Sequence, residues 1–311
     1  MDNQLISIVI LTFKRRELTR KAIFSAFFQR YAFKEVLLVD NGSGDGTGQD
    51  LKSAFPELKL IELPSNIGAV GRSEGIKVAN GEFIVTLDND VYFESNLAAE
   101  RLVEVFNHFE NVACINFKIL RNANSPDLAS WCHPRDINDY FDKSFETDYI
   151  SEGACAFRRS AIKKVGYYYP PLFMGHEGED LALRLLDAGY DILYTPEVEV
   201  YHLASMDERP SWRVYYYNTR NNIWVTVKNY DYLYSIKYIL FYLAILFFFS
   251  FRAGQMSAYF VGVKDGFLGL SRIMEDRKPI KQETILKLKK IHSLRPNIFK
   301  RIRKHLKTRI I

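Results

Sequence analysis

Short apolar runs alternate with amphipathic segments through the first half of the chain. Runs rich in β-branched residues, typical of buried parallel strands, occur at 6–12, 35–40, 58–63, 83–88 and 112–117. The intervening segments 17–29, 47–54, 72–79 and 96–109 have patterns typical of helices. This alternation predicts an α/β fold with a Rossmann-like, mostly parallel central sheet flanked by helices. In such sheets ligands gather at the carboxyl ends of strands, so the residues that end each strand are the first site candidates.

The second half of the chain departs from this alternation. Residues 122–149 are irregular and rich in Asn, Asp, Ser and Pro, which favours a long loop region that shapes an acceptor site. A helix is then expected to begin at Glu179 or Asp180, followed by strands at 191–195 and 198–202. Beyond Pro210 the chain becomes aromatic and basic, which indicates a different kind of region.

Two features of this region point to a membrane. The uncharged run 238–251 contains five Phe and two Tyr, but it is shorter than the roughly twenty residues that span a bilayer. It is either a buried core helix or an interfacial segment, and its aromatic content favours the interface. From Lys281 onward, eleven Lys or Arg face one acid, Glu283, in a chain of net charge +5. This charge favours an anionic membrane surface over a nucleic acid or a solvated tail, so we expect peripheral attachment.

Composition limits the remaining classes. With 311 residues, 48% of them hydrophobic, the chain is globular and long enough for one large core and a smaller second region. Its three cysteines, at 114, 132 and 155, fit neither a disulfide framework nor a zinc knuckle. The opening residues MDNQLISIVI lack the basic start of a secretory signal. We therefore expect a cytoplasmic protein attached to the inner face of the cell membrane.

The strongest chemical signal is TLDND, in which Asp88, Asn89 and Asp90 follow an apolar strand. Alternate side chains of a strand share a face, so Asp88 and Asp90 are able to converge on one hard cation. Such a cation would stabilise the charge on a departing diphosphate. The alternative is a plain turn, since Asp and Asn are common there.

A second polar strand end occurs at LLVDNGSGDGT, where Asp40 is placed to accept hydrogen bonds from a base or a ribose. A turn with a helix N-cap is the alternative reading. No GxGxxG follows the first strand and no GxxxxGK[ST] occurs in the chain, which argues against nicotinamide and P-loop sites.

Four segments occur in order along the chain: ILTFKR, VDNGSGDGT, SNIGAVGRSEGI and LDND. They resemble the inverting glycosyltransferases of family two, which have the GT-A fold, and in particular bacterial rhamnosyltransferase-like members of polysaccharide assembly. The resemblance covers about residues 5–230. It implies a catalytic domain at 1–205, with a nucleotide-binding half to about 118 and an acceptor-binding half from 119, and a membrane-associating helical region at 206–311. It also implies nucleotide-sugar contacts by Thr12, Phe13, Arg15, Asp40, Asn66, Gly68, Arg72, Asp88 and Asn89.

The segment GHEGEDLALRLLDAGYDILYTPEVEVYH resembles the family's catalytic block, commonly EDxDLxxRxxxxG. Gly178 stands where the usual second acid would be, so the role of the base falls to Glu177, Glu179 or Asp180. His202 matches a histidine that completes the metal site, which implies Mn²⁺ or Mg²⁺ on Asp90, Asp88 and His202. The resemblance places Arg220 of YYYNTRNNIW on the acceptor side, where Gly153, Ala154 and His176 are also expected.

The resemblance predicts transfer of a sugar from a nucleoside diphosphate donor, of the UDP or dTDP type, to a glycan or lipid-linked acceptor with inversion. Two alternatives stay open. A sugar nucleotidyltransferase also uses paired carboxylates and a doubly wound sheet, and a protein with glycine at position 178 could bind a nucleotide sugar without turning it over. No nucleic-acid partner is expected.

Overall fold

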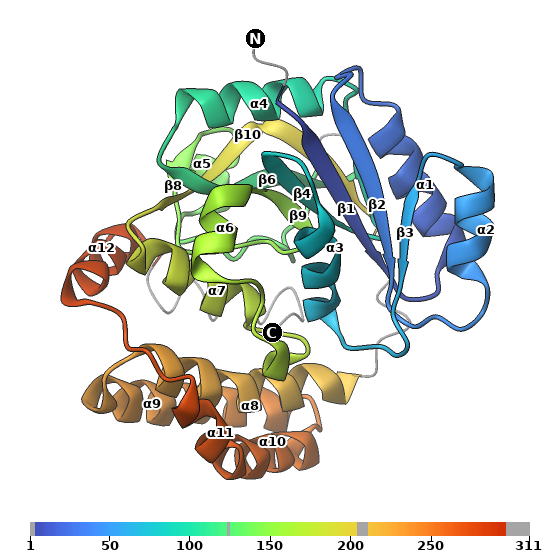
Figure 1. Ribbon diagram of the computed structural model, residues 1–311. Coiled ribbons are helices and arrows are strands. Elements are labelled where there is room, and N and C mark those ends of the chain that lie inside the picture. Colours follow the sequence, from blue (N-terminus) through green and yellow to red (C-terminus); the bar gives the residue numbers. More distant parts are fainter. Residues whose placement is uncertain (1–3, 123–124, 204–210, 297–311) are drawn as a thin grey trace.

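The computed structural model describes residues 4–122, 125–203 and 211–296 (Figure 1). One mixed sheet has the strand order β3-β2-β1-β4-β9-β6-β10-β5, and short strands β7 and β8 pair with β6 and β10. The strands are β1 (Ile6–Thr12), β2 (Lys34–Asp40), β3 (Lys59–Glu62), β4 (Phe83–Asp88), β5 (Val91–Phe93), β6 (Val112–Asn122), β7 (Ser125–Pro126), β8 (Phe145–Glu146), β9 (Ala154–Arg158) and β10 (Asp191–His202). Strands β3, β2, β1 and β4 run parallel, as do β6 and β10, whereas β9 and β5 are antiparallel to their neighbours. The predicted α/β fold with a mostly parallel sheet is confirmed.

Helices cover both faces of this sheet (Figure 1). In the sheet domain they are α1 (Arg16–Phe27), α2 (Thr47–Ala54), α3 (Arg72–Val78), α4 (Ala98–His108), α5 (Ile137–Tyr140), α6 (Arg159–Val165) and α7 (Glu177–Asp187). Strand β1 shows how the residue pattern builds the two layers. Ile8 and Ile10 belong to the core that includes Ile23 of α1, whereas Val9 belongs to the opposite core with Ile76 of α3. The period of two in β1 thus divides its apolar residues between two hydrophobic cores.

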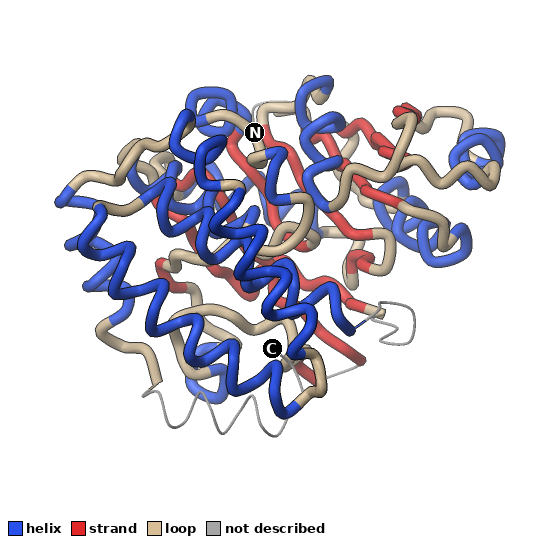
Figure 2. The backbone as a smooth tube through the Cα atoms, turned by 90° about the horizontal axis from the view of Figure 1, so that it is seen from below, coloured by secondary structure: helices blue, strands red, loops and turns tan. Residues whose placement is uncertain are grey.

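The remaining helices are α8 (Ser211–Asn229), α9 (Tyr232–Arg252), α10 (Met256–Leu268), α11 (Leu270–Glu275) and α12 (Gln282–His292). Helices α8 to α11 form a layer beneath the sheet domain in Figure 1, and Figure 2 shows this layer from below, in front of the strands. Helix α12 returns to the sheet domain, where Leu288 and Ile291 are buried and Lys287 pairs with Glu146 at 3.1 Å. Part of the basic segment that begins at Lys281 therefore packs on the protein itself. The remainder of that segment, 297–311, lies outside the described residues.

Four local differences from the sequence prediction concern the acceptor half. The region 122–149 contains β7, α5 and β8 and is not a continuous loop, and the two strands expected at 191–202 are one strand, β10. Helix α7 begins at Glu177, two residues before the expected start, because His176 has a left-handed backbone that ends the preceding loop. Strand β9 was not expected, since its short apolar run ACAFR is followed directly by a helix.

The apolar run at 238–251 is the centre of a longer helix. Helix α9 has 21 residues and is, among the described residues, the one helix long and apolar enough to cross a membrane by length and composition. The uncharged run itself is shorter than a span, but it lies within a helix of sufficient length, because the helix begins at Tyr232, six residues before the run. Only 22% of its apolar window is buried in the protein, so much of its apolar surface has no protein partner.

Candidate functional site

A large cavity opens at the carboxyl ends of β1 and β4 and extends to α7, α8 and α9. Its volume is about 1550 Å³, whereas a site for one small ligand typically has roughly 300–1,000 Å³. The cavity therefore has room for a donor and an acceptor together. Eleven predicted site residues line it: Phe13, Arg15, Asn66, Gly68, Arg72, Asp88, Asn89, Gly153, His176, Glu177 and Glu179.

Strained backbone is concentrated around this cavity. In the described part of the chain, the non-glycine residues with positive φ are Lys14, Arg15, Phe173 and His176, and all four line the cavity. Such conformations cost about 1–3 kcal/mol each and cluster at functional sites. The Phe173 carbonyl accepts the N–H of Ala69 at 2.7 Å, which ties the loop before α7 to the SNIGAVG segment. The fold thus maintains strain on two sides of the same cavity.

Asp88, at the end of β4, lies between a cation and a glycine. Arg72 forms an ion pair with Asp88 and is only 5% exposed. A Cβ atom on Gly153 would lie 2.3 Å from an Asp88 carboxylate oxygen, so glycine at this position leaves room for the Asp88 carboxylate where it now lies. Burial alone would lower the pKa of Arg72, but the surrounding negative groups, Asp88 foremost and then Glu152 and Glu177 among them, raise it. Arg72 is therefore the positive centre of an acidic cluster.

Asp90 lies behind the cavity wall, next to His202. Nε2 of His202 is 3.8 Å from Oδ1 of Asp90, and Arg15 donates to Oδ2 of Asp90 at 3.0 Å. Nδ1 of His202 is 2.7 Å from Oδ2 of Asp127. Burial opposes a charge on His202, but the hydrogen bond to Asp127 and the nearby Asp90 raise its pKa. Burial would raise the pKa of Asp127, but hydrogen bonds from His202 and Ser130 lower it to about 2.

The three predicted metal ligands are not brought into one cluster. Asp90 and His202 are neighbours, whereas Asp88 is paired with Arg72. Over residues 4–122, 125–203 and 211–296, no group of three or more His, Cys, Asp or Glu side chains has a metal-binding arrangement. The described residues thus offer a two-residue arrangement, Asp90 with His202, with Asp127 behind the histidine.

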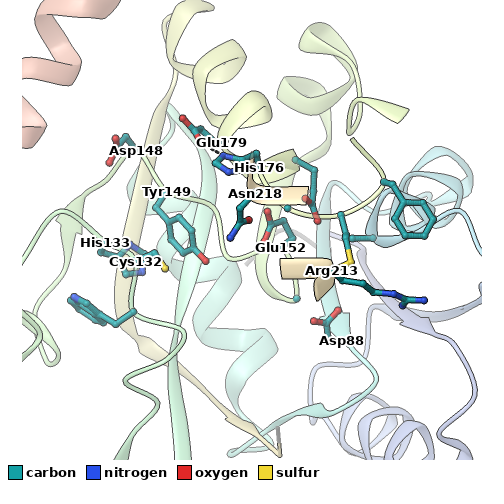
Figure 3. A pocket seen from close by; sticks show the side chains of 18 of the residues that line it. Asp88, Cys132, His133, Asp148, Tyr149, Glu152, His176, Glu179, Arg213 and Asn218 are labelled. Carbon is teal, nitrogen blue, oxygen red and sulfur yellow. Dashed lines mark hydrogen bonds and ion pairs between the residues drawn. The ribbon is translucent and has the colours of Figure 1, made fainter. Parts of the chain in front are cut away.

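Three further carboxylates line the cavity near the N-terminus of α7. Glu152 accepts the N–H of Gly178 at 2.7 Å, and Figure 3 shows its side chain between Asp88 and the pair formed by His176 and Glu179. Nδ1 of His176 lies 2.6 Å from Oε2 of Glu179. Glu177 is 4% exposed, and burial, followed by the charge of Glu152, raises its pKa to about 8. Glu152 was not among the predicted site residues.

Asp180, one of the three predicted base candidates, does not line the cavity. It is fully buried and bonded to Lys228 at 2.6 Å, to Arg184 at 2.9 Å and to Asn229 at 2.9 Å. Burial alone would raise the pKa of Asp180, but Arg184 and Lys228 lower it. Its charge is therefore matched by protein cations and holds α7 against α8.

Two predicted nucleotide contacts support the cavity without lining it. Each carboxylate oxygen of Asp40 accepts a backbone N–H, from Ser43 at 3.0 Å and from Gly48 at 3.2 Å, and these bonds shape the turn into α2. The side chain that lines the cavity at this strand end is Asn41, which donates to Asn66 at 3.1 Å. Thr12 is buried and hydrogen-bonded to Thr19 and to the Lys14 carbonyl, which fixes the strained turn after β1.

On the acceptor side, two of the four predicted residues hold the site in place from outside the cavity. Arg220 donates to the Leu172 carbonyl at 2.9 Å and stacks on Trp224, and Ala154 is buried in β9. Next to Arg220, the amide of Asn221 donates to the carbonyls of residues 172, 174 and 175. Helix α8 thereby clamps the loop that leads into α7. Asn218 of α8 lines the cavity itself.

The far wall of the cavity is aromatic. Tyr230, Tyr234, Tyr238 and Tyr242 line it, and successive rings along this series are 4.5–5.6 Å apart. The opposite side of α9 carries exposed apolar residues, among them Leu233, Leu240, Phe248 and Phe251. Tyr230 lies in the turn between α8 and α9, and Tyr234, Tyr238 and Tyr242 follow on α9 at a spacing of four residues, which places side chains on one helix face and which the sequence prediction did not use. One helix therefore contributes both a wall of the site and an exposed apolar surface.

Comparison with known proteins gives the family. Residues 7–166 match the sequence model of "Glycosyl transferase family 2". The O-antigen chain rhamnosyltransferase WbaN of Salmonella anatum is 26% identical over 195 residues, which cover 58% of this chain and 60% of that protein. The poly-beta-1,6-N-acetyl-D-glucosamine synthase of Staphylococcus epidermidis is 25% identical over 203 residues, 61% of this chain and 48% of that protein. The chain thus spans about half to three fifths of the length of these relatives.

Solved structures share the fold. The mannosyltransferase PcManGT from Pyrobaculum calidifontis, in complex with GDP-Man and Mn²⁺, superposes with a TM-score of 0.57 at 15% identity, over 98% of this chain and 84% of that chain. GalNAc-T7 with UDP, GalNAc and Mn²⁺ gives a TM-score of 0.60 at 18% identity, over 74% of this chain and 48% of that one. These likenesses establish the GT-A fold. With its family match covering more than half of its length, the chain belongs to glycosyltransferase family 2.

Proposed function

We propose that this protein transfers one sugar, with inversion, from a nucleoside diphosphate donor of the UDP or dTDP type to a lipid-linked glycan. The reaction would take place at the cytoplasmic face of the membrane, in cell-surface polysaccharide synthesis. One observation carries the proposal: a single cavity joins the nucleotide-sugar segments of the family to the acids at α7 and to the aromatic wall of α9.

The donor end of the cavity is the carboxyl edge of β1 and β4. The ring of Phe13 is 40% exposed there and offers an apolar face for a nucleobase. Asn41 and Asn66 present amide groups at the same edge, and Arg72 supplies a positive charge near Asp88. An aromatic face, polar amides and a fixed cation fit a nucleoside diphosphate.

The side chains at Asp90 and His202 fit a divalent cation. A metal-binding histidine normally has its second ring nitrogen held by a carboxylate, and Asp127 holds Nδ1 of His202 in this way. Carboxylate and imidazole suit Mn²⁺, and Mg²⁺ is the alternative for a site completed by phosphate oxygens. When bound, the cation would supply charge to stabilise the leaving diphosphate.

The base would come from the acids that line the cavity. Inverting transfer requires a carboxylate that takes the proton of the acceptor hydroxyl as its oxygen attacks the anomeric carbon. Glu152, Glu177 and Glu179 line the cavity, and all lie at or beside the first turn of α7. The N-terminal dipole of α7 favours an ionised carboxylate at this end of the helix.

A lipid-linked acceptor fits the position of α9. The exposed apolar residues of α9 and α10, including Phe251 and Phe260, would enter the membrane interface, while the tyrosine face of α9 would receive the glycan. This arrangement would present the end of a membrane-bound glycan to the acids at α7.

A donor screen tests the proposal. Purified protein is incubated with Mn²⁺ and individual nucleotide sugars, with and without lipid-linked acceptors, and the release of free nucleoside diphosphate is measured. We expect release from at least one UDP- or dTDP-sugar and faster release with an acceptor. Release of sugar 1-phosphate instead, from attack at the α-phosphorus of the donor, would indicate nucleotidyl transfer. Nucleotide-sugar binding without any turnover would indicate a non-catalytic protein.

A further inference from the structure

We propose that Glu152 is the catalytic base, and that its carboxylate occupies the space left by the missing acid at position 178. This inference rests on the proposed sugar transfer and names the group that accepts the proton. Glu152 lies outside the EDxDL-like segment, in the loop just before Gly153 and β9.

Glu152 and Gly178 fit one another sterically. A Cβ atom built on Gly178 would lie 2.3 Å from Oε1 and 2.8 Å from Cδ of Glu152. The backbone carbonyl oxygen of Ile150 would also lie 2.8 Å from this Cβ atom, so the Glu152 side chain and the backbone at residue 150 together leave no room for a side chain at position 178. The Gly178 N–H donates to the same Oε1 at 2.7 Å, which anchors the carboxylate at the first turn of α7. An acid from the loop that precedes β9 thus takes the place of one carried by the helix.

The backbone holds Glu152 at the centre of the site. Its carbonyl accepts the hydroxyl of Thr86 at 2.7 Å, and the next carbonyl, that of Gly153, accepts the N–H of Asp88 at 3.0 Å. Both bonds tie the residue to the end of β4, where the donor is expected. In Figure 3 the Glu152 carboxylate accordingly lies between Asp88 and His176. A base between donor and acceptor ends is what in-line attack on the anomeric carbon requires.

The neighbouring acids are less suited to the role. Oε2 of Glu177 has no hydrogen-bond partner among the described residues, and burial together with Glu152 raises its pKa to about 8. Burial also raises the pKa of Glu152, although Arg72 and the Gly178 N–H reduce this effect. A backbone N–H therefore holds the Glu152 carboxylate in place, whereas Oε2 of Glu177 has no such donor among the described residues. Glu179 is paired with His176.

The proposed step conserves atoms and charge. The acceptor oxygen forms a bond to the anomeric carbon, and its proton passes to the carboxylate of Glu152. The bond from the anomeric carbon to the phosphate oxygen breaks, and its electron pair leaves with the nucleoside diphosphate. In donor hydrolysis, water replaces the acceptor hydroxyl and loses its proton to the same group.

The test compares Glu152→Gln with the wild type, using the donor found in the screen. Glutamine keeps an oxygen for the Gly178 N–H but does not accept the proton. We expect nucleoside diphosphate release to fall about 10²–10⁴-fold, with unchanged binding of UDP or dTDP. Glu104→Gln, an exposed change on α4, serves as the control and should keep wild-type release. Release by Glu152→Gln within threefold of the wild type would overturn the proposal. A wild type that neither binds nor cleaves any nucleotide sugar would instead refute the proposed function.

A second experiment moves the carboxylate from position 152 to position 178, to distinguish a role of Glu152 in proton transfer from a structural role. The double variant Glu152→Gly with Gly178→Asp returns a carboxylate to the helix, and its matched control carries Gly178→Ala in place of the aspartate. Both variants place a Cβ atom against the carbonyl of Ile150, so this contact is the same in the two proteins. We expect the aspartate variant to release at least tenfold more nucleoside diphosphate than the alanine variant. Equal, low release from two folded proteins would assign Glu152 a structural role and overturn the proposal. If the pair does not fold, Glu152→Gln decides alone.

Discussion

Replacing Asp180 with asparagine tests whether this carboxylate supports the fold or takes part in catalysis. Asp180 is fully buried, and its partner Lys228 has a side chain only 8% exposed. Removing one partner of such a pair leaves a buried charge without compensation and typically costs about 3–5 kcal/mol. We expect the free energy of unfolding to fall by about that amount, which corresponds to roughly 6–10 °C in Tm for a large domain. The loss should be smaller when Lys228→Met is added, because the unmatched cation is then absent.

Urea unfolding of both single variants, of the double variant and of an exposed control, Asp139→Asn, measures these differences. The control should change stability by less than about 0.5 kcal/mol. Donor cleavage by folded Asp180→Asn, measured well below its Tm, should stay within tenfold of the wild type because Asp180 does not line the cavity. A stability loss below about 1 kcal/mol, combined with a hundredfold loss of turnover, would refute this assignment and return Asp180 to the catalytic candidates.

Three other predictions follow from charge. Burial raises the pKa of Glu177 in the folded protein from 4.5 to about 8, so the wild type loses stability as the pH rises between these two values. Urea unfolding should therefore show Glu177→Gln to be more stable than the wild type at about pH 9 but not at pH 5. Asp127→Asn should weaken Mn²⁺ binding about 10–100-fold by calorimetry, because Nδ1 of His202 loses its carboxylate; unchanged affinity would exclude His202 as a ligand. Deleting 297–311, which removes six Lys or Arg and no acid, should weaken binding to anionic liposomes and reduce its salt dependence, whereas neutral liposomes should show no difference.

The sequence predicted those features that a local pattern determines. Strand β4 matches its predicted bounds because five consecutive apolar or β-branched residues end in an aspartate. Helix α2 also matches, since a glycine-rich turn precedes it. The length of α9 was underestimated because the uncharged run was taken as the limit of the helix, although Asp231 caps the helix nearly two turns earlier, before Lys237. A charged residue such as Lys237 is compatible with the interior of a helix, whereas a capping residue such as Asp231 marks where the helix begins.

Site residues were predicted from the sequence only where they belong to a recognisable motif. Asp88 and Arg72 were each proposed from a motif of their own, and the fold brings the two side chains into contact. Glu152 precedes a strand that the sequence pattern did not predict, and it belongs to none of the motifs from which site residues were proposed. One signal was available: glycine at position 178 in place of an acid implies that something else fills that space. Which residue fills it depends on the pairing of β9 with β4, a long-range contact that no local pattern encodes.

The C-terminal helices are also part of the site's construction. Asn221 of α8 binds three carbonyls of the loop that ends at His176, and Lys228 of the same helix neutralises Asp180 inside α7. Helix α8 therefore holds both the loop before α7 and the first turn of α7 itself. The next helix, α9, carries the exposed apolar surface. Because Glu152 is anchored to Gly178 in that same turn, the position of the proposed base depends on α8 as well as on the sheet. A boundary near residue 205 thus separates two stretches of sequence but does not separate two functional units, since neither stretch alone completes the cavity.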